Sequence, residues 1–428
     1  MSTTSLPSYV APPTFTRTPT YSAEPHAYEQ RLALNRPAQR PAGSFVKQSK
    51  NVSLRLYAQE DNASLPVYGC GAAVEGSVTL SKVEGVTAVD VKIEGSLILR
   101  EVGEGGTTTY KLCLDTVTLW NRNTDPESCP TTLEFSLNLP TTFSDGKDTY
   151  PLPPTHDVHL SGVPGFNATI EYMVSVSVAK GSRASSLLLR MGNGNVSTPF
   201  IYHPRSRPSV PLPARMRQSS ETFKFIPNPE WNCHESVIRT RQAGGKDVVC
   251  ELYLPASRVF SLTQAIPFHV VFCSSAFSLA AFMPYGPTAT ILAPNKQFTR
   301  LRVLRQSTVD VRNELVLGTK TDIWRVDTIG EGDFKHAGDG HEWLCFSGEI
   351  QLDKDVKVGS FKAGGLIVRD FLEFTMHPPE PAKAPFKEMR LVIPIRLTTD
   401  PWSVDSMTSA VVDDWSSPPT PPDLAYAY

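Results

Sequence analysis

The segment Ile170–Val178 reads IEYMVSVSV, in which large apolar residues alternate with polar or smaller ones. Successive residues of a strand point to opposite faces of a sheet, so this spacing predicts a strand with one buried and one wet face. The same alternation recurs in four other segments, namely Val74–Leu80, Val89–Glu94, Leu366–Met376 and Leu391–Leu397. No run of a dozen residues has sustained helical periodicity. The pattern predicts an all-β protein made of two consecutive antiparallel β-sandwiches.

Composition narrows the class of protein further. The chain has 428 residues, a length typical of two or three domains. Its 37 prolines are about twice the usual share, which disfavours a helical bundle or solenoid. The formal net charge of -2 disfavours a nucleic-acid-binding polycation, so we expect no nucleic-acid partner.

The charge changes sign along the chain, and these changes suggest domain boundaries. Residues 51–180 carry a net charge of -8, whereas residues 181–224 carry +6 and five prolines. Proline at this density resists both helices and central strands, which is typical of a linker. We therefore expect a disordered Pro/Ser/Thr-rich tail at 1–49, a first sandwich at 50–180, a basic Pro-rich linker at 181–222, a second sandwich at 223–400 and an acidic Pro-rich disordered tail at 401–428.

The cysteines and the apolar segments bear on the cellular compartment. Seven cysteines occur without a CxxC pair, and the first thirty residues lack the apolar stretch of a signal peptide. We therefore expect reduced thiols and a cytoplasmic protein. The most apolar segment, 265–283, contains a proline, a histidine and several serines, and its β-branched and aromatic residues favour two buried strands over a spanning helix.

A search for catalytic motifs yields weak candidates. His156 and His159 have a possible metal-ligand spacing without companion ligands, and we interpret them as a solvated pair. Cys233 and His234 are neighbours that would point apart on a strand. The glycine clusters at 103–106, 192–194 and 330–332 lack the GK[ST] of a phosphate loop and are interpreted as hairpin turns. We predict no catalytic, metal or cofactor site and no enzymatic activity.

Several motifs in sequence order resemble the arrestin-like family, which includes the alpha-arrestins and fungal arrestin-like proteins. The family pattern P-x-Y-x-x-G-x-x-V-x-G-x-V-x-L is matched by Pro66, Tyr68, Gly71, Val74, Gly76, Val78 and Leu80. Further family-like segments are Leu133–Pro140, Leu152–Thr155, Gly165–Tyr172, Cys250–Pro255, Ile266–Val270 and Leu391–Ile395. A departure is Thr263-Gln264, where the family often has Pro-Gly. The similarity spans about 50–400 and implies two immunoglobulin-like sandwiches.

The N-terminal segment contains three proline–aromatic motifs spaced six residues apart: LPSY, PPTF and TPTY. Proline favours the polyproline II conformation, and an aromatic residue can fill a groove of a WW domain. PPxY itself is absent, and such matches also arise freely in low-complexity tails. The candidate WW-ligand residues are Leu6, Pro7, Tyr9, Pro12, Pro13, Phe15, Pro19 and Tyr21.

Basic residues form a second candidate binding feature. They could contact acidic partners or lipid headgroups, and the alternative is an ordinary solvated surface. The candidate contact patch consists of Arg205, Arg207, Arg215, Arg217, Arg300 and Arg302.

The family resemblance implies a non-enzymatic trafficking adaptor that links a membrane transporter or receptor cargo to a HECT-type ubiquitin ligase, through the ligase's WW domains. It further implies a cytoplasmic protein that is recruited, as a peripheral membrane protein, to the plasma membrane or to endosomes. A different hypothesis is a retromer-like or signalling scaffold subunit with the same double-sandwich fold and no ligase recruitment. A hydrolase would need a polar pocket that no motif indicates.

The alternating pattern predicts a far-UV circular dichroism spectrum dominated by β-structure. Proline and period-two patterning leave few positions where a long helix could form. A strong helical double minimum would contradict this prediction.

Overall fold

The computed structural model describes residues 25–32, 41–103, 106–181, 194–219, 224–288, 297–312 and 320–404. The protein is mostly β, with 61% of it in strands. Within the described ranges the one α-helix is α1 (Ala276–Phe282), which continues into the 3-10 turn η2 (Met283–Tyr285). The all-β class is therefore confirmed.

The first unit, residues 41–203, is built from two sheets that share one hydrophobic core. The first sheet contains, in spatial order, β2 (Gly43–Ser49), β3 (Val52–Gln59), β5 (Ala73–Leu80) and β8 (Thr132–Asn138). The second contains β4 (Val67–Tyr68), β13 (Gly194–Tyr202), β12 (Gly165–Lys180), β6 (Val86–Val102) and β7 (Thr107–Asn121), with β11 (His156–Leu160) paired to β12. A small hairpin is formed by β9 (Thr142–Ser144) and β10 (Thr149–Pro151).

The second unit, residues 224–400, is one strongly curled ten-stranded sheet around its own core. This differs from the expected pair of separate sheets, because hydrogen bonds connect all of its strands. In spatial order the strands are β15 (Trp231–Ile238), β16 (Val248–Pro255), β18 (Ile266–Cys273), β21 (Trp343–Leu352), β20 (Lys320–Gly340), β19 (Thr299–Arg312), β23 (Leu366–Met376), β24 (Met389–Thr398) and β17 (Val259–Ser261), with β22 (Phe361–Ala363) on β23.

Glycines allow part of this curled sheet to pack tightly. A Cβ added at Gly348, the partner of Phe268 on β21, would lie 2.3 Å from the Phe268 ring, and one added at Gly332 on β20 would lie 3.0 Å from it. Glycine in a strand often marks such a close approach. The prediction of a hairpin turn at 330–332 was therefore wrong, because these residues lie inside β20.

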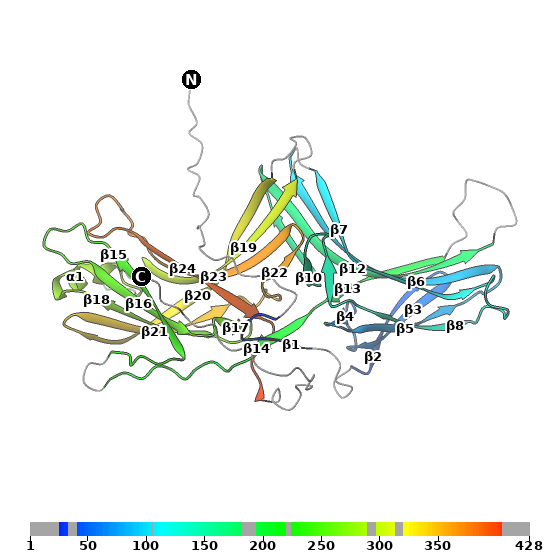
Figure 1. Ribbon diagram of the computed structural model, residues 1–428, viewed down its shortest axis with the longest axis horizontal. Coiled ribbons are helices and arrows are strands. Elements are labelled where there is room, and N and C mark those ends of the chain that lie inside the picture. Colours follow the sequence, from blue (N-terminus) through cyan, green and yellow to red (C-terminus); the bar gives the residue numbers. More distant parts are fainter. Residues whose placement is uncertain are drawn as a thin grey trace, which may run out of the picture.

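The two units meet at a junction (Figure 1), and part of this junction is apolar. Five buried residues of the second unit belong to the hydrophobic core of the first: Val309, Ile323, Ala363, Leu366 and Val368. The junction is close at Gly365, where an added Cβ would lie 2.8 Å from Leu99 of β6. The first core is therefore completed by side chains that come from far along the sequence.

Three of the expected boundaries need correction. The segment 1–49 was expected to be disordered, but β2 and a further strand, β1 (Glu29–Leu32), lie within it. The first sandwich was expected to end at 180, but β13 follows and pairs with β12 from Tyr172 to Val178. Within the expected linker, β14 (Arg205–Pro208) pairs with β1 at the junction. Tertiary pairing provides hydrogen-bond partners that the local composition does not indicate.

Residues 214–216 of the expected linker are held against the second unit by a buried histidine. His269 of β18 accepts a hydrogen bond from the backbone N–H of Met216 at 3.2 Å, and its ring packs between Phe225 and Trp231. The Trp231 indole N–H donates to the carbonyl of Ala214 at 3.1 Å. Residues 214–216 are therefore docked rather than free.

The expectation for 265–283 was half right. Its first part is the buried strand β18, but its second part is the helix α1 and not a strand. Ser275 caps α1 by accepting a hydrogen bond from the N–H of Ser278, and the segment is rich in the helix formers Ala and Leu. A seven-residue helix is too short to establish a helical period in the sequence.

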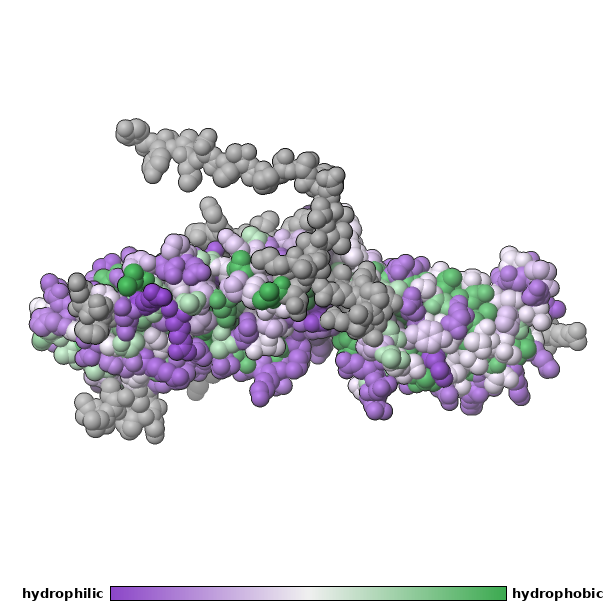
Figure 2. Space-filling view, turned by 90° about the horizontal axis from the view of Figure 1, so that it is seen from below, coloured by the Kyte–Doolittle hydropathy of each residue, from purple (hydrophilic) through white to green (hydrophobic). Residues whose placement is uncertain are grey.

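Exposed apolar residues are scattered over the surface. The most exposed are Val163 (81%) and Val404 (67%), with Phe277 and Tyr28 about half exposed. On the face seen in Figure 2, hydrophobic residues form small patches separated by hydrophilic ones. Scattered apolar residues of this kind are normal on a folded protein.

The shared core predicts that Leu366→Ala destabilises the protein strongly. Leu366 is fully buried in the core of the first unit, so its truncation should lower the free energy of unfolding by about 2–5 kcal/mol in urea titrations. Leu114→Ala is a matched control, because Leu114 is 49% exposed, and should change stability by less than about 0.5 kcal/mol. Equal effects of the two substitutions would contradict this account of the junction.

Candidate functional site

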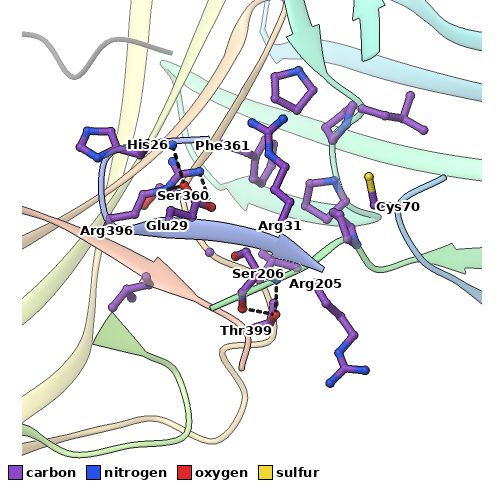
Figure 3. Close-up of a pocket in the computed structure, with 18 of the residues that line it drawn as sticks. His26, Glu29, Arg31, Cys70, Arg205, Ser206, Ser360, Phe361, Arg396 and Thr399 are labelled. Carbon is purple, nitrogen blue, oxygen red and sulfur yellow. Dashed lines mark hydrogen bonds and ion pairs between the residues drawn. The ribbon is translucent and has the colours of Figure 1, made fainter. Parts of the chain in front are cut away.

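A cavity of about 100 Å³, with apolar and charged side chains in its lining, lies at the junction of the two units (Figure 3). It lies beneath β1 and has walls from both units. Residues of six strands and their connecting loops line it, among them Glu29 and Arg31 of β1, Pro151–Pro154 before β11, Tyr202 of β13, and Ser360–Lys362 at β22.

Strand β1 is held in place by a buried ion pair. Glu29 is 8% exposed, and its carboxylate oxygens accept hydrogen bonds from Arg396 Nε at 3.0 Å and Nη2 at 3.2 Å. Arg396 lies on β24, so the pair connects the N-terminal segment to the second unit. A buried carboxylate without its cation would be strongly destabilising, and the pair therefore fixes β1 against β24.

A second polar link joins β14 to the end of β24. Arg205 forms an ion pair with Asp400, and Thr399 exchanges hydrogen bonds with the backbone of Ser206 at 2.9 and 3.0 Å. Burial alone would raise the pKa of Asp400, but hydrogen bonds from Arg205 and Thr399 hold it below its usual value. Asp400 is therefore ionised at neutral pH and attracts Arg205.

The wall formed by 358–362 is organised by an ion pair inside the second unit. Arg305 and Asp370, 7% and 2% exposed, form two hydrogen bonds of 2.8 and 3.0 Å. Arg305 also donates to the carbonyl of Val358, and Ser360 donates to Asp370, both at 2.8 Å. Two charges, a hydroxyl and a backbone carbonyl thus satisfy one another and position the chain that enters β22.

His156 faces this wall from the first unit. Its ring lies edge-on to Phe361 with centroids 5.2 Å apart, and its buried Nε2 has no hydrogen-bond partner. Burial, together with a smaller contribution from the nearby Arg305, lowers the pKa of His156 to about 4. His156 is therefore neutral at pH 7, and the interpretation of a solvated His156–His159 pair was wrong for its first member. His159 is exposed and contacts Asn167 Oδ1 at 2.6 Å.

The charged residues of this site pair with one another and hold separate segments of the chain together, and we call this set of contacts the clamp. Glu29, Arg396, Arg205 and Asp400 are each engaged with an opposite charge, and Lys362 lies 4.8 Å from the centre of the Tyr150 ring. These contacts join the N-terminal strand, the linker and both units. In the part of the chain that the structure describes, no group of three His, Cys, Asp or Glu residues has the arrangement of a metal site.

The candidate WW-ligand residues, Leu6 to Tyr21, lie outside the described residues. Cys233 and His234 are consecutive on β15 and so lie on opposite faces of the sheet. No helix within the described ranges is long and apolar enough to cross a membrane.

The six arginines of the candidate basic patch are in three places. Arg205 and Arg207 lie on β14 at the junction, where Arg207 donates to Gln30 Oε1 at 3.2 Å. Arg300 and Arg302 belong to the second unit, where Arg300 pairs with Glu331 at 3.7 Å and Arg302 with Glu373 at 2.7 Å. Arg215 and Arg217 lie in the segment before this unit, where Arg215 pairs with Glu349 and Arg217 is exposed. Intramolecular carboxylates therefore neutralise much of the charge that these residues could offer a partner.

Sequence reasoning missed the ion pairs Glu29–Arg396 and Arg305–Asp370, although the second of them left a signal. Arg305 falls in the alternating run Leu301, Val303, Arg305, Ser307 and Val309, on the parity that faces inward. Asp370 occupies the corresponding inward position between Val368 and Leu372, and it lies opposite Arg305 in the register of β19 and β23. Opposite charges at inward positions of two strands predict a buried pair. Glu29, in a segment without such a period, offered no comparable signal.

No family model and no curated protein matches the sequence of this chain. The resemblance of its motifs to arrestin-like proteins therefore stays a prediction.

The environment of His156 predicts a pH dependence of stability. The pKa of His156 is about 4 in the folded protein and about 6.5 when unfolded, so the unfolded state binds more protons between these values. The stability that the protein gains by keeping His156 neutral is therefore present above pH 6.5 and is lost as the pH falls towards 4. His156→Phe, which keeps an aromatic ring beside Phe361, should reduce this loss in thermal melts between pH 7 and 4.5.

The matched control is His377→Phe, because the His377 side chain is 52% exposed. It should leave the pH profile of the melting temperature as in the unsubstituted protein. An unchanged profile for His156→Phe would show that other groups dominate the acid response.

Proposed function

We propose that this protein is an arrestin-like trafficking adaptor with two immunoglobulin-like β-sandwich domains, and that it links membrane cargo to a HECT-type ubiquitin ligase. The observation that carries the proposal is the placement of the family-like motifs. The Pro66–Leu80 motif runs through β4 and β5, Leu133–Pro140 forms β8, and Gly165–Tyr172 begins β12. Each motif occupies a strand or its entry, in the order that the resemblance implies.

The second unit supports the same proposal. Cys250–Pro255 and Ile266–Val270 lie on the paired strands β16 and β18, and Leu391–Ile395 lies on β24. A strongly curled sheet folds over its own core and can enclose it as two facing sheets do. Thr263-Gln264, which stands where the family often has Pro-Gly, is compatible with a turn at this position. The Thr263 N–H donates a hydrogen bond to Ser261 Oγ at 3.1 Å and so helps to close the turn.

The clamp at the junction suits an adaptor. Strand β1, β14 and the end of β24 are joined by ion pairs, so the N-terminal segment is anchored where the two units meet. Motifs upstream of β1 would then be presented from a defined point on a rigid body. In this proposal the folded units contact cargo at a membrane surface, and the N-terminal segment recruits the ligase through its WW domains.

The test is removal of the three aromatic anchors of the N-terminal motifs. The combined variant Tyr9→Ala, Phe15→Ala and Tyr21→Ala should abolish binding to a purified tandem WW fragment of a HECT-type ligase, whereas each single change should weaken it modestly. Linked weak sites raise the effective concentration, so the array can exceed one site by on the order of 100-fold. Isothermal titration and ubiquitination assays measure the two effects.

The matched control removes three aromatic residues from the other end of the chain: Trp415→Ala, Tyr426→Ala and Tyr428→Ala. It should retain ligase binding, and both variants should keep the melting temperature of the unsubstituted protein. If the Tyr9, Phe15 and Tyr21 variant still binds the WW fragment and is ubiquitinated normally, the retromer-like or signalling scaffold becomes the better hypothesis.

A further inference from the structure

A second cavity lies at the end of the first unit that points away from the junction, where β12 ends (right-hand side of Figure 1). Its volume is about 330 Å³, and it opens between the two sheets of this unit. The turn between β2 and β3, the end of β5, the end of β12 and the start of β13 contribute its lining: Ser49, Lys50, Asn51, Val52, Leu80, Lys82, Val178, Lys180, Gly194 and Asn195.

The cavity has an apolar floor and a cationic rim. Val52, Leu80 and Val178 are at most 3% exposed and belong to the core of the first unit. The ammonium-bearing side chains come from three different elements, with Lys50 after β2, Lys82 after β5 and Lys180 at the end of β12. Both sheets of the unit therefore contribute a positive charge to one opening.

These three positive charges lie in a unit whose net charge is negative. Residues 51–180 contain sixteen acidic and eight basic residues, yet none of the described residues that line this cavity carries a carboxylate. Among the described residues, none of Lys50, Lys82 and Lys180 forms an ion pair. The arginines of the candidate basic patch, in contrast, are largely paired with acids of the same chain.

From this arrangement we propose that the cavity is a binding site for a compact ligand with clustered phosphate groups. Three like charges around one opening repel each other, and a multivalent anion would relieve that repulsion while pairing with each ammonium group. A lysine ammonium offers three N–H donors and is a common phosphate ligand. The Asn195 side chain adds an uncharged polar group to the lining. This site is independent of the junction and of the N-terminal motifs.

Clustered phosphates of this kind occur on soluble inositol polyphosphates and on the headgroups of phosphoinositide lipids. Both sources share the chemistry that the lysines recognise, and they differ in whether a bilayer is needed. Two binding assays separate them. One uses isothermal titration with soluble inositol hexakisphosphate, and the other uses sedimentation with phosphatidylcholine vesicles that contain phosphatidylinositol 4,5-bisphosphate.

The decisive variant combines Lys50→Gln, Lys82→Gln and Lys180→Gln in the full chain. At roughly 1 kcal/mol for each charge near a surface, the loss of three lysines should weaken binding by about 100-fold and flatten its dependence on salt. The matched control combines Lys111→Gln, Lys335→Gln and Lys354→Gln, which removes the same charge from three exposed lysines that do not line the cavity. The control should bind as the unsubstituted protein does.

Each outcome decides the proposal. Binding of the soluble probe that only the first variant loses supports a site for a soluble polyphosphate. Binding confined to the vesicles, with the same pattern of variants, supports a site for a lipid headgroup. The proposal is overturned if neither probe binds, or if the two variants weaken binding equally. Circular dichroism melts of both variants establish that each is folded.

Discussion

The ion pair between Arg305 and Asp370 is the constraint on which the junction depends. Both residues are almost completely buried, and neither charge would be tolerated there alone. Their hydrogen bonds with the backbone of Val358 and the hydroxyl of Ser360 fix the chain that enters β22. That chain presents Phe361 to His156 and leads to Leu366, which completes the core of the first unit. A polar pair inside the second unit thus determines how the first unit is closed.

The junction combines two kinds of interaction with different roles. Burial of Val309, Leu366 and Val368 in the first core supplies non-directional stabilisation. The ion pairs Glu29–Arg396 and Arg205–Asp400 add little net stability by the usual balance of charge attraction and desolvation, but they require specific partners. They therefore select which segments lie at the junction, and this explains how a strand as polar as β1 is held there.

Much of the first unit could be predicted from the sequence, because its long strands alternate regularly between core and solvent. Residues Ile170–Val178, for example, have the inward-facing side chains that the alternation predicts. The pairing of β1 with β14, the docking of Met216 on His269 and the continuous curled sheet could not be predicted, since each depends on residues distant in the sequence. Short elements such as α1 carry too few residues to show a period. The lysine cavity was missed because Lys50, Lys82 and Lys180 are distant in the sequence and come together only where the ends of β2, β5 and β12 meet.

The anchoring of β1 also limits the positions at which a ligase could bind. Pro25, the first described residue, lies four positions after Tyr21, and a chain extends by at most about 3.6 Å for each residue. This length of chain can span at most about 14 Å before it reaches Pro25, whose neighbour His26 lines the junction cavity. The lysine cavity lies at the opposite end of the first unit. In these proposals a ligase domain bound at Tyr21 would lie on the junction side of the first unit and a polyphosphate ligand bound at the lysines would lie at its far end, so binding of one would leave the other site open.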